Sequence, residues 1–161
     1  MPTLSVDHAF GIAELMDHAN AVLQEMVEEA VITAEERAGM VLGSYPRRRD
    51  EVLAPFAKNG LFQGLVVEDY EELEPRDAAW VEYEQNGDKE ALAKKRALFF
   101  RATFMPSLAS AVTRVRDGDQ EALRIFADRL ESGLTQRLVR HPVPAHIVFQ
   151  TITLAKSGCS L

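Results

Sequence analysis

Side chains able to bind metals, transfer protons or attack substrates are few and widely separated in this sequence. His8 and His18 lie ten residues apart, and two prolines separate His141 from His146. Neither histidine pair has the spacing of a metal site. Cys159 is the only cysteine, which excludes a disulfide framework and a thiolate metal cluster. No arrangement of residues supports nucleophilic catalysis, so we predict no metal site and assign no catalytic residue.

The glycines do not form a nucleotide-binding turn. Nine glycines are scattered along the chain, and no Gly-x-Gly-x-x-Gly pattern occurs. Such a turn normally lies between a strand and a helix, where backbone N–H groups hold phosphate or other anionic groups. The sequence therefore leaves the residues of a cofactor site unknown.

Composition indicates a single domain covering residues 1–161. The hydrophobic content of 47% is enough for one substantial core. A net charge of -7 argues against nucleic acid as a partner, and the short basic cluster Arg47–Arg49 does not reverse this balance. No apolar run approaches the roughly 20 residues needed to span a membrane. With no signal peptide recognised, we expect a soluble, cytoplasmic protein.

Helical periodicity dominates two long regions, about 7–58 and 77–140. We expect the first helix to begin near Asp7, and we expect Pro106 to bend a helix of the second region or to begin a new one. The apolar face of the first helix recurs at steps of three and four residues. Its members are Ile12, Leu15, Met16, Ala19, Val22, Leu23, Met26, Val27 and Ala30.

Polar residues predict where several helices begin. Thr33 and Glu36 have the spacing of a capping box, in which each side chain bonds the backbone of the other residue. Asp77, Asp88 and Asp119 each precede a helical pattern and are predicted N-caps. These signals divide the two long regions into shorter helices.

Strand signals occur twice, at about 61–70 and about 146–154. Asn59 and Gly60 supply a left-handed stop before the first strand, and Gly64 indicates a bulge or a close neighbour within it. A sheet of two strands is marginally stable unless other elements cover it. We therefore expect either that the helices close over these strands or that a second chain completes the sheet.

Five phrases in the sequence resemble one known family. They are Met26–Ile32, Glu35–Glu36, Tyr45–Val52, Gly60–Phe62 and Arg101–Leu108. In order and spacing they are similar to the "MVxEGLI", "EE", "Y-x-x-S-x-EE", "G-x-F" and "R-A-x-x-x-P-L" phrases of the S-adenosylmethionine-dependent carboxyl methyltransferases. This is the salicylate, benzoate and jasmonate methyltransferase (SABATH) family.

The resemblance runs from about Phe10 to Ser157 and covers only the C-terminal half of that family. It implies an α+β, mostly helical fold, in which a helical cap joins the last antiparallel strand pair of a Rossmann-like methyltransferase sheet. The family's glycine-rich N-terminal half, which holds the cofactor, has no counterpart in this sequence. We expect S-adenosylmethionine to be the cofactor of the whole assembly and not to bind this chain alone.

The resemblance also implies a reaction and a pocket. The carboxyl group of a small organic acid would accept the methyl group, and a carboxylate is already ionised at neutral pH. The cap therefore needs to align the substrate and exclude water more than to move protons. Carried over from the family, the substrate-binding positions are Phe100, Thr103 and His146.

Each of these residues also has a purely structural interpretation. Phe99, Phe100 and Phe104 have the helical spacing of core residues. His146 is a single histidine at a strand start, where a structural role is common. Arg101, in the same phrase as Thr103, could pair with the acidic run Glu68–Glu74 or with a neighbouring helix terminus, in an ordinary ion pair at the surface or between helices.

Two functions from different classes remain open. In the first, the chain is the cap and substrate-pocket portion of a carboxyl methyltransferase, inactive alone and completed by a cofactor-binding half. In the second, it is a non-catalytic helical module that binds a small molecule or forms a homodimer. The expected partners are thus a small carboxylic acid together with either a complementary half or a second copy.

Overall fold

The computed structural model describes residues 12–42 and 47–157 of the chain. Where the sequence predicted one domain, contacts divide the chain into two compact units. The helical unit comprises residues 12–43 and 77–144, and the strand unit comprises residues 1–11, 44–76 and 145–161. The predicted cap Asp7, together with His8, Tyr45 and Cys159, lies outside the described residues.

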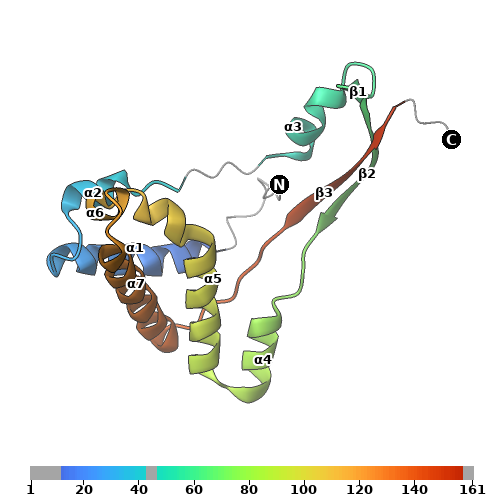
Figure 1. Cartoon of the computed structure of the whole chain (residues 1–161). Helices are drawn as coiled ribbons and strands as arrows, with labels where there is room; N and C mark the ends of the chain where they lie inside the picture. Colours follow the sequence, from blue (N-terminus) through green and yellow to red (C-terminus); the bar gives the residue numbers. More distant parts are fainter. Residues whose placement is uncertain (1–11, 43–46, 158–161) are drawn as a thin grey trace. The chain divides into compact units, whose positions relative to one another are not determined.

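Six helices build the helical unit, and α5 and α7 are the longest (Figure 1). The bounds are α1 Ala13–Glu28, α2 Ala34–Gly39, α4 Ala78–Asn86, α5 Lys89–Ala109, α6 Thr113–Arg116 and α7 Gln120–Arg140. Helix α7 packs against both α1 and α5. The largest fully buried side chains all lie on these three helices: Phe100, Phe126, Leu15, Met26, Leu130, Leu134, Leu138 and Val22.

The predicted helix caps at Thr33, Asp77, Asp88 and Asp119 are confirmed. The Thr33 hydroxyl accepts from the Glu36 N–H at 3.1 Å, and the Glu36 carboxylate accepts from the Thr33 N–H at 2.8 Å. Asp77, Asp88 and Asp119 each accept a hydrogen bond from the backbone N–H three residues further on. Each cap satisfies an N–H that has no partner within its own helix.

Helix α5 contains Pro106 and ends soon after it. The helix runs from Lys89 to Ala109, so Pro106 lies inside it and does not begin a new helix. Proline has no N–H and clashes with the preceding turn, and α5 ends three residues after Pro106. Val112 precedes the short helix α6.

Helices α1 and α7 approach closely at a glycine. A Cβ atom added to Gly133 of α7 would lie 2.7 Å from Val22 Cγ1 of α1, so only glycine fits without a shift. Ion pairs flank this contact: Arg129 bonds Glu29 at 2.5 Å, and Arg137 bonds Glu25. Arg137, followed by Arg129, lowers the pKa of the Glu25 carboxyl below its ordinary value.

The described residues of the strand unit form two short helices and one antiparallel sheet. Its elements are α3 Arg49–Leu53, the 3₁₀ helix η1 Ala54–Phe56, β1 Leu61–Phe62, β2 Leu65–Leu73 and β3 Phe149–Lys156. The strand order is β1-β2-β3, and every pair is antiparallel. With the helical unit, this sheet confirms an α+β protein and the predicted antiparallel pairing of the two strand regions.

The first predicted strand is in fact a hairpin. Leu61–Phe62 and Leu65–Leu73 are separate strands, and Phe62 pairs with Leu65. Gln63 and Gly64 between them have φ values of 50° and 78°. Two successive positive φ values are characteristic of a two-residue hairpin turn. Gly64 therefore marks a turn, and the interpretation of a bulge at this residue was wrong.

The main sheet pairing joins segments that are distant in sequence. Leu73 of β2 pairs with Phe149 of β3, and Leu65 pairs with Lys156. The second strand begins three residues later than predicted, because pairing starts only at Phe149. A bulge lies between Val67 and Asp69.

Candidate functional site

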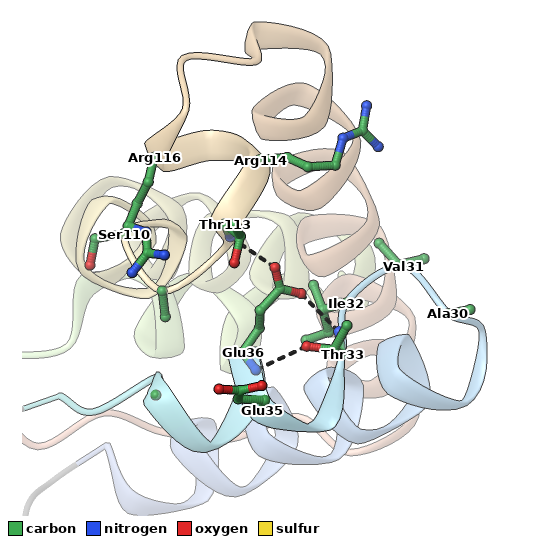
Figure 2. A pocket seen from close by; sticks show the side chains of 12 residues that line it. Ala30, Val31, Ile32, Thr33, Glu35, Glu36, Ser110, Thr113, Arg114 and Arg116 are labelled. Atoms are coloured by element: carbon green, nitrogen blue, oxygen red, sulfur yellow. Dashed lines mark hydrogen bonds between the residues drawn. The ribbon is translucent and has the colours of Figure 1, made fainter.

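The helical unit holds an open cavity of about 870 Å³ beside α2 and α6 (Figure 2). Its walls come from the turn after α1, from α2, from the end of α5 and from α6. The lining residues are Ala30, Val31, Ile32, Thr33, Glu35, Glu36, Gly39, Ser110, Ala111, Thr113, Arg114 and Arg116. This volume lies within the range of small-molecule sites in proteins.

Glu36 joins the two sides of the cavity. One carboxylate oxygen accepts from the Thr33 N–H, and the other accepts from the Thr113 N–H, each at 2.8 Å (Figure 2). The hydrogen bonds from these two N–H groups lower the pKa of the Glu36 carboxyl. Glu36 is therefore ionised and satisfied at neutral pH. It fixes α2 against the start of α6 and is unsuited to accept a proton from a ligand.

Two arginines line the same cavity in different ways. Arg114 bonds Asp119 through Nε at 3.0 Å and through its terminal nitrogen at 2.5 Å, and its side chain points away from Glu36 in Figure 2. Arg116 is exposed, and no ion pair joins it to another described residue. Among the lining residues, Arg116 is thus the cation most available to a ligand, and Glu35 is the exposed carboxylate.

Apolar and small side chains form the rest of the wall. Ile32 is almost fully buried beneath the cavity, and Ala111 lies 3.5 Å from the position of a Cβ on Gly39. A pocket with an apolar floor and a few charged groups at its rim suits binding better than catalysis. No paired acid and base lies among its lining residues.

Phe100 lies in the core of α5. Its side chain is 1% exposed, and its ring centroid lies 5.1 Å from that of Phe104. Phe99, at the adjoining position, is 36% exposed and packs edge-on against Phe104. The core interpretation is therefore confirmed for Phe100, and Phe99 lies at the surface.

Thr103 and His146 are both exposed, and they belong to different units. Thr103 lies on α5 of the helical unit. His146 precedes β3 in the strand unit, with its Nδ1 3.7 Å from Glu74 Oε1. Phe100 and Thr103 are one helical turn apart on α5, whereas His146 belongs to the other unit. The substrate-binding role of these three residues stays a prediction.

Arg101 forms ion pairs between helices, as its plainer interpretation predicted. Its guanidinium lies 2.5 Å from Glu131 Oε2 and 3.2 Å from Asp128 Oδ1, both on α7. Glu131, followed by Asp128, raises the pKa of Arg101. Arg101 therefore connects α5 to α7, and its charge is neutralised by these two ion pairs.

Sequence reasoning missed a buried arginine on the same helix. Arg96 is only 8% exposed, and its guanidinium bonds the Asp77 carboxylate and the Val143 carbonyl oxygen. Asp77 also caps α4, so one carboxylate both begins a helix and neutralises a buried cation. The available signal was the position of Arg96 on the apolar side of α5, four residues after Leu92 and four before Phe100.

The described residues lack the glycine-rich loop that binds S-adenosylmethionine in Rossmann-like methyltransferases. Gly60, Gly64, Gly87 and Gly118 have positive φ values. None of these four joins a strand to a following helix, where a glycine-rich donor loop would lie. The connection from β2 to α4 contains no glycine. The described residues therefore contain no recognisable binding site for the cofactor.

Two further features bear on the class of protein. In the part of the chain that the structure describes, no three histidine, cysteine or acidic side chains are grouped as metal ligands would be. None of the helices among residues 12–42 and 47–157 is both long and apolar enough to span a membrane.

Comparison of the chain with known protein families and with curated proteins finds no match.

Proposed function

We propose that this chain is the cap and substrate-pocket portion of an S-adenosylmethionine-dependent methyltransferase that acts on the carboxyl group of a small organic acid. The proposal builds on the resemblance to the C-terminal half of the SABATH family. A separate donor-binding half supplies the rest of the Rossmann-like sheet. The chain alone is inactive.

Backbone geometry supports the resemblance at two of its phrases. Ala30 has a φ of 57°, although L-residues rarely adopt positive φ. The family phrase "MVxEGLI" has glycine at this position, and glycine adopts such a conformation without strain. Gly60, which opens the "G-x-F" phrase, has a φ of 68° and directly precedes β1. The phrases thus fall where the chain needs unusual backbone angles.

The arrangement of the strands also agrees with the proposal. β2 and β3 pair antiparallel along eight positions, and most of the helical unit lies between them in sequence. A terminal strand pair interrupted by a helical cap is the arrangement that the resemblance implies.

The observation that carries the proposal is how few side chains are buried among the described residues of the strand unit. Among its described residues, only Val148 and Gln150 are buried. Leu61, Phe62 and Leu154 remain 44%, 42% and 41% exposed. Single exposed apolar side chains are normal on protein surfaces, and Leu98 of the helical unit is 45% exposed, so the informative difference is the small number of buried side chains. A sheet that lacks a core of its own is what a separated portion of a larger sheet presents.

Calorimetry with the demethylated product S-adenosylhomocysteine tests the proposal. The chain is titrated alone, and again after mixing with the N-terminal half of a carboxyl methyltransferase that does not bind the ligand when alone. Heat of binding is expected only in the mixture. In a separate assay, transfer of the methyl group from S-adenosylmethionine to a small carboxylic acid, which leaves S-adenosylhomocysteine, is also expected only in the mixture. No heat and no transfer in the mixture would exclude the proposal.

A variant pair locates the substrate pocket. Thr103→Trp adds a large side chain at an exposed predicted pocket position, so the helical unit should still fold. In the mixture we expect the KM for the acid to rise about tenfold or more, equivalent to at least about 1.4 kcal/mol of binding. Lys94→Trp, exposed on the same helix more than two turns away, is the matched control and should leave KM unchanged.

The cavity beside α2 and α6 favours a second candidate, a non-catalytic module that binds a small molecule. It lies wholly within the helical unit and offers one available cation, Arg116. This candidate predicts that small carboxylates bind the chain alone and that Arg116→Ala removes the binding. The methyltransferase proposal requires neither result.

A further inference from the structure

Two charged side chains that line the cavity beside α2 and α6 have no partner among the described residues. Arg116 of α6 and Glu35 of α2 are both exposed, and no ion pair or hydrogen bond joins either side chain to another described residue. Figure 2 shows Arg116 extending from α6 towards α2, the helix that carries Glu35. The cavity thus presents one unpaired cation and one unpaired carboxylate to a molecule that enters it.

The other charged groups of the cavity are already satisfied. Glu36 accepts hydrogen bonds from two backbone N–H groups, and Arg114 bonds Asp119. The ionised Glu36 still adds negative charge next to Glu35 in the same helix. A ligand with only a carboxylate would meet Arg116 together with these two like charges, which oppose its binding. A ligand with only an ammonium group would leave Arg116 without a partner.

Apolar side chains supply much of the remaining lining. Ala30, Val31, Ile32 and Ala111 line the cavity, and Ile32 is almost fully buried. The cavity volume of about 870 Å³ exceeds that of a single free amino acid. An apolar part of a ligand can therefore lie against this lining while its charged groups contact the charged side chains, as is usual in small-molecule sites.

We propose that this cavity binds a small zwitterion, a molecule with both a carboxylate and an ammonium group, such as a free amino acid. The ligand carboxylate pairs with the guanidinium of Arg116, which can donate two parallel hydrogen bonds to it. The ligand ammonium group pairs with the carboxylate of Glu35. The inference rests on the second candidate function, for which it names the ligand class, and the methyltransferase proposal does not require it.

NMR titration of the isotope-labelled full chain with three leucine derivatives tests the ligand class. L-Leucine carries both charges, N-acetyl-L-leucine lacks the ammonium group, and L-leucinamide lacks the carboxylate. Binding at an open site is weak, so ligand concentrations run from about 0.1 mM to about 30 mM. We expect L-leucine to shift backbone amide signals of the cavity lining, with a Kd about fivefold lower than that of either derivative, as for a well-oriented ion pair at a partly exposed site.

Substitutions assign the two charges separately. Arg116→Ala should raise the Kd for L-leucine about fivefold and leave that for L-leucinamide unchanged, because L-leucinamide has no carboxylate. Glu35→Gln should have the same effect on L-leucine and none on N-acetyl-L-leucine. Both side chains are exposed and unpaired among the described residues, so both variants should fold, which circular dichroism checks. Arg140→Ala, at an exposed arginine of α7 outside the cavity lining, is the matched control and should change no Kd.

A further probe measures the separation of the two charges. ε-Aminocaproate carries its carboxylate and ammonium group at opposite ends of a flexible chain. Tighter binding than that of L-leucine, with the same dependence on Arg116 and Glu35, would support a zwitterion whose charges are far apart. Weaker binding than that of L-leucine would support a free amino acid.

Equal Kd values for L-leucine and N-acetyl-L-leucine would overturn the proposal, because a carboxylate alone would then suffice. Absence of binding by both zwitterions, or a Kd that neither Arg116→Ala nor Glu35→Gln changes, would also overturn it. S-adenosylhomocysteine is itself a zwitterion, so its titrations are repeated in Arg116→Ala, which removes heat that arises from this cavity. Methyl transfer in the mixture requires neither side chain, so failure of this site and failure of the methyltransferase proposal are distinguishable.

Discussion

The helical unit and the strand unit differ in where their apolar side chains lie. In the helical unit, Val22, Leu130 and Leu134 have no exposed surface. In the strand unit, Leu61 and Leu154 are more than two fifths exposed. Burial of apolar surface is the main favourable term in folding, so the helical unit has a stabilising core and the described strand unit has very little of one.

The difference extends to charge. Charged residues of the helical unit are arranged in pairs between helices, such as Arg101 with Glu131 and Arg129 with Glu29. The acidic residues of β2 follow one another in sequence, and Tyr70 among them bonds Glu72. Burial and this carboxylate raise the pKa of Tyr70 to about 12. Among the described residues, the helical unit thus combines a buried apolar core with ion pairs between helices, and the strand unit combines exposed apolar side chains with a run of acidic ones.

The largest expected effect is the loss of stability when a buried leucine of the helical unit is truncated, compared with a partly exposed leucine of the strand unit. Leu130→Ala removes a side chain with no exposed surface from α7 and leaves a cavity. It should lower the free energy of unfolding of the helical unit by about 2 to 5 kcal/mol. Leu154→Ala in β3 is the matched change at a 41% exposed site and should cost less than about 1 kcal/mol. Urea denaturation measures both, and equal losses would contradict the comparison.

A smaller loss is expected where α1 meets α7. Gly133→Ala would place a Cβ 2.7 Å from Val22 Cγ1. The overpacking should cost about 1 to 3 kcal/mol, despite the roughly 1 kcal/mol by which alanine favours a helix over glycine. Gly39→Ala is the control, because its nearest neighbour, Ala111, lies at an ordinary 3.5 Å. Thermal unfolding should show a lower Tm for Gly133→Ala only.

Breaking the link between α2 and α6 should have a moderate effect. Glu36→Ala removes a carboxylate that accepts from the Thr33 and Thr113 N–H groups. The expected loss is about 1 to 2 kcal/mol, typical of a helix-capping side chain. Glu35→Ala, in the same helix, is the control and should change the free energy of unfolding by less than about 0.5 kcal/mol. The two variants are compared by chemical denaturation.

The smallest expected effect is a pH dependence of the helical unit. Burial, followed by the charges of His141 and Arg137, lowers the pKa of His18 below its ordinary 6.5. The unfolded chain therefore binds the proton more readily than the folded chain. The neutral His18 side chain therefore contributes to the free energy of unfolding in full above pH 6.5. This contribution is lost as the pH falls towards the pKa of His18 in the folded chain. We expect Tm to fall by a few degrees at most between pH 7 and pH 5.

His18→Gln should flatten this part of the Tm profile, because its side chain does not titrate. His146→Gln, in the strand unit, is the matched control and should leave the profile of the helical unit unchanged. A profile that is equally steep in His18→Gln and in the unaltered chain would show that His18 is not responsible.

Sequence patterns predicted the local features of this fold well. Thr33, Asp77, Asp88 and Asp119 cap helices as expected, because capping depends on residues three or four apart. The hairpin at Gln63 was missed, because its first strand has only two residues and shows no alternation.

The candidate sites were less predictable than the fold. Phe100 was expected both in a pocket and in the core, and helical periodicity alone does not separate these roles. The cavity beside α2 was not predicted. Its walls come from four segments, and only packing brings residues such as Glu36 and Thr113 together. Arg96 was missed because a buried arginine is recognised by its partners, Asp77 and Val143, and both lie distant in sequence.

Amide hydrogen exchange tests the central claim, that the strand unit requires a partner to complete it. In dilute solution, amides of β2 and β3 should exchange much faster than those of α5 and α7. Addition of the donor-binding half should slow exchange in β2 and β3 and leave α5 and α7 unchanged. Equal protection of the strands and helices in the dilute chain, with no response to the added half, would contradict the claim.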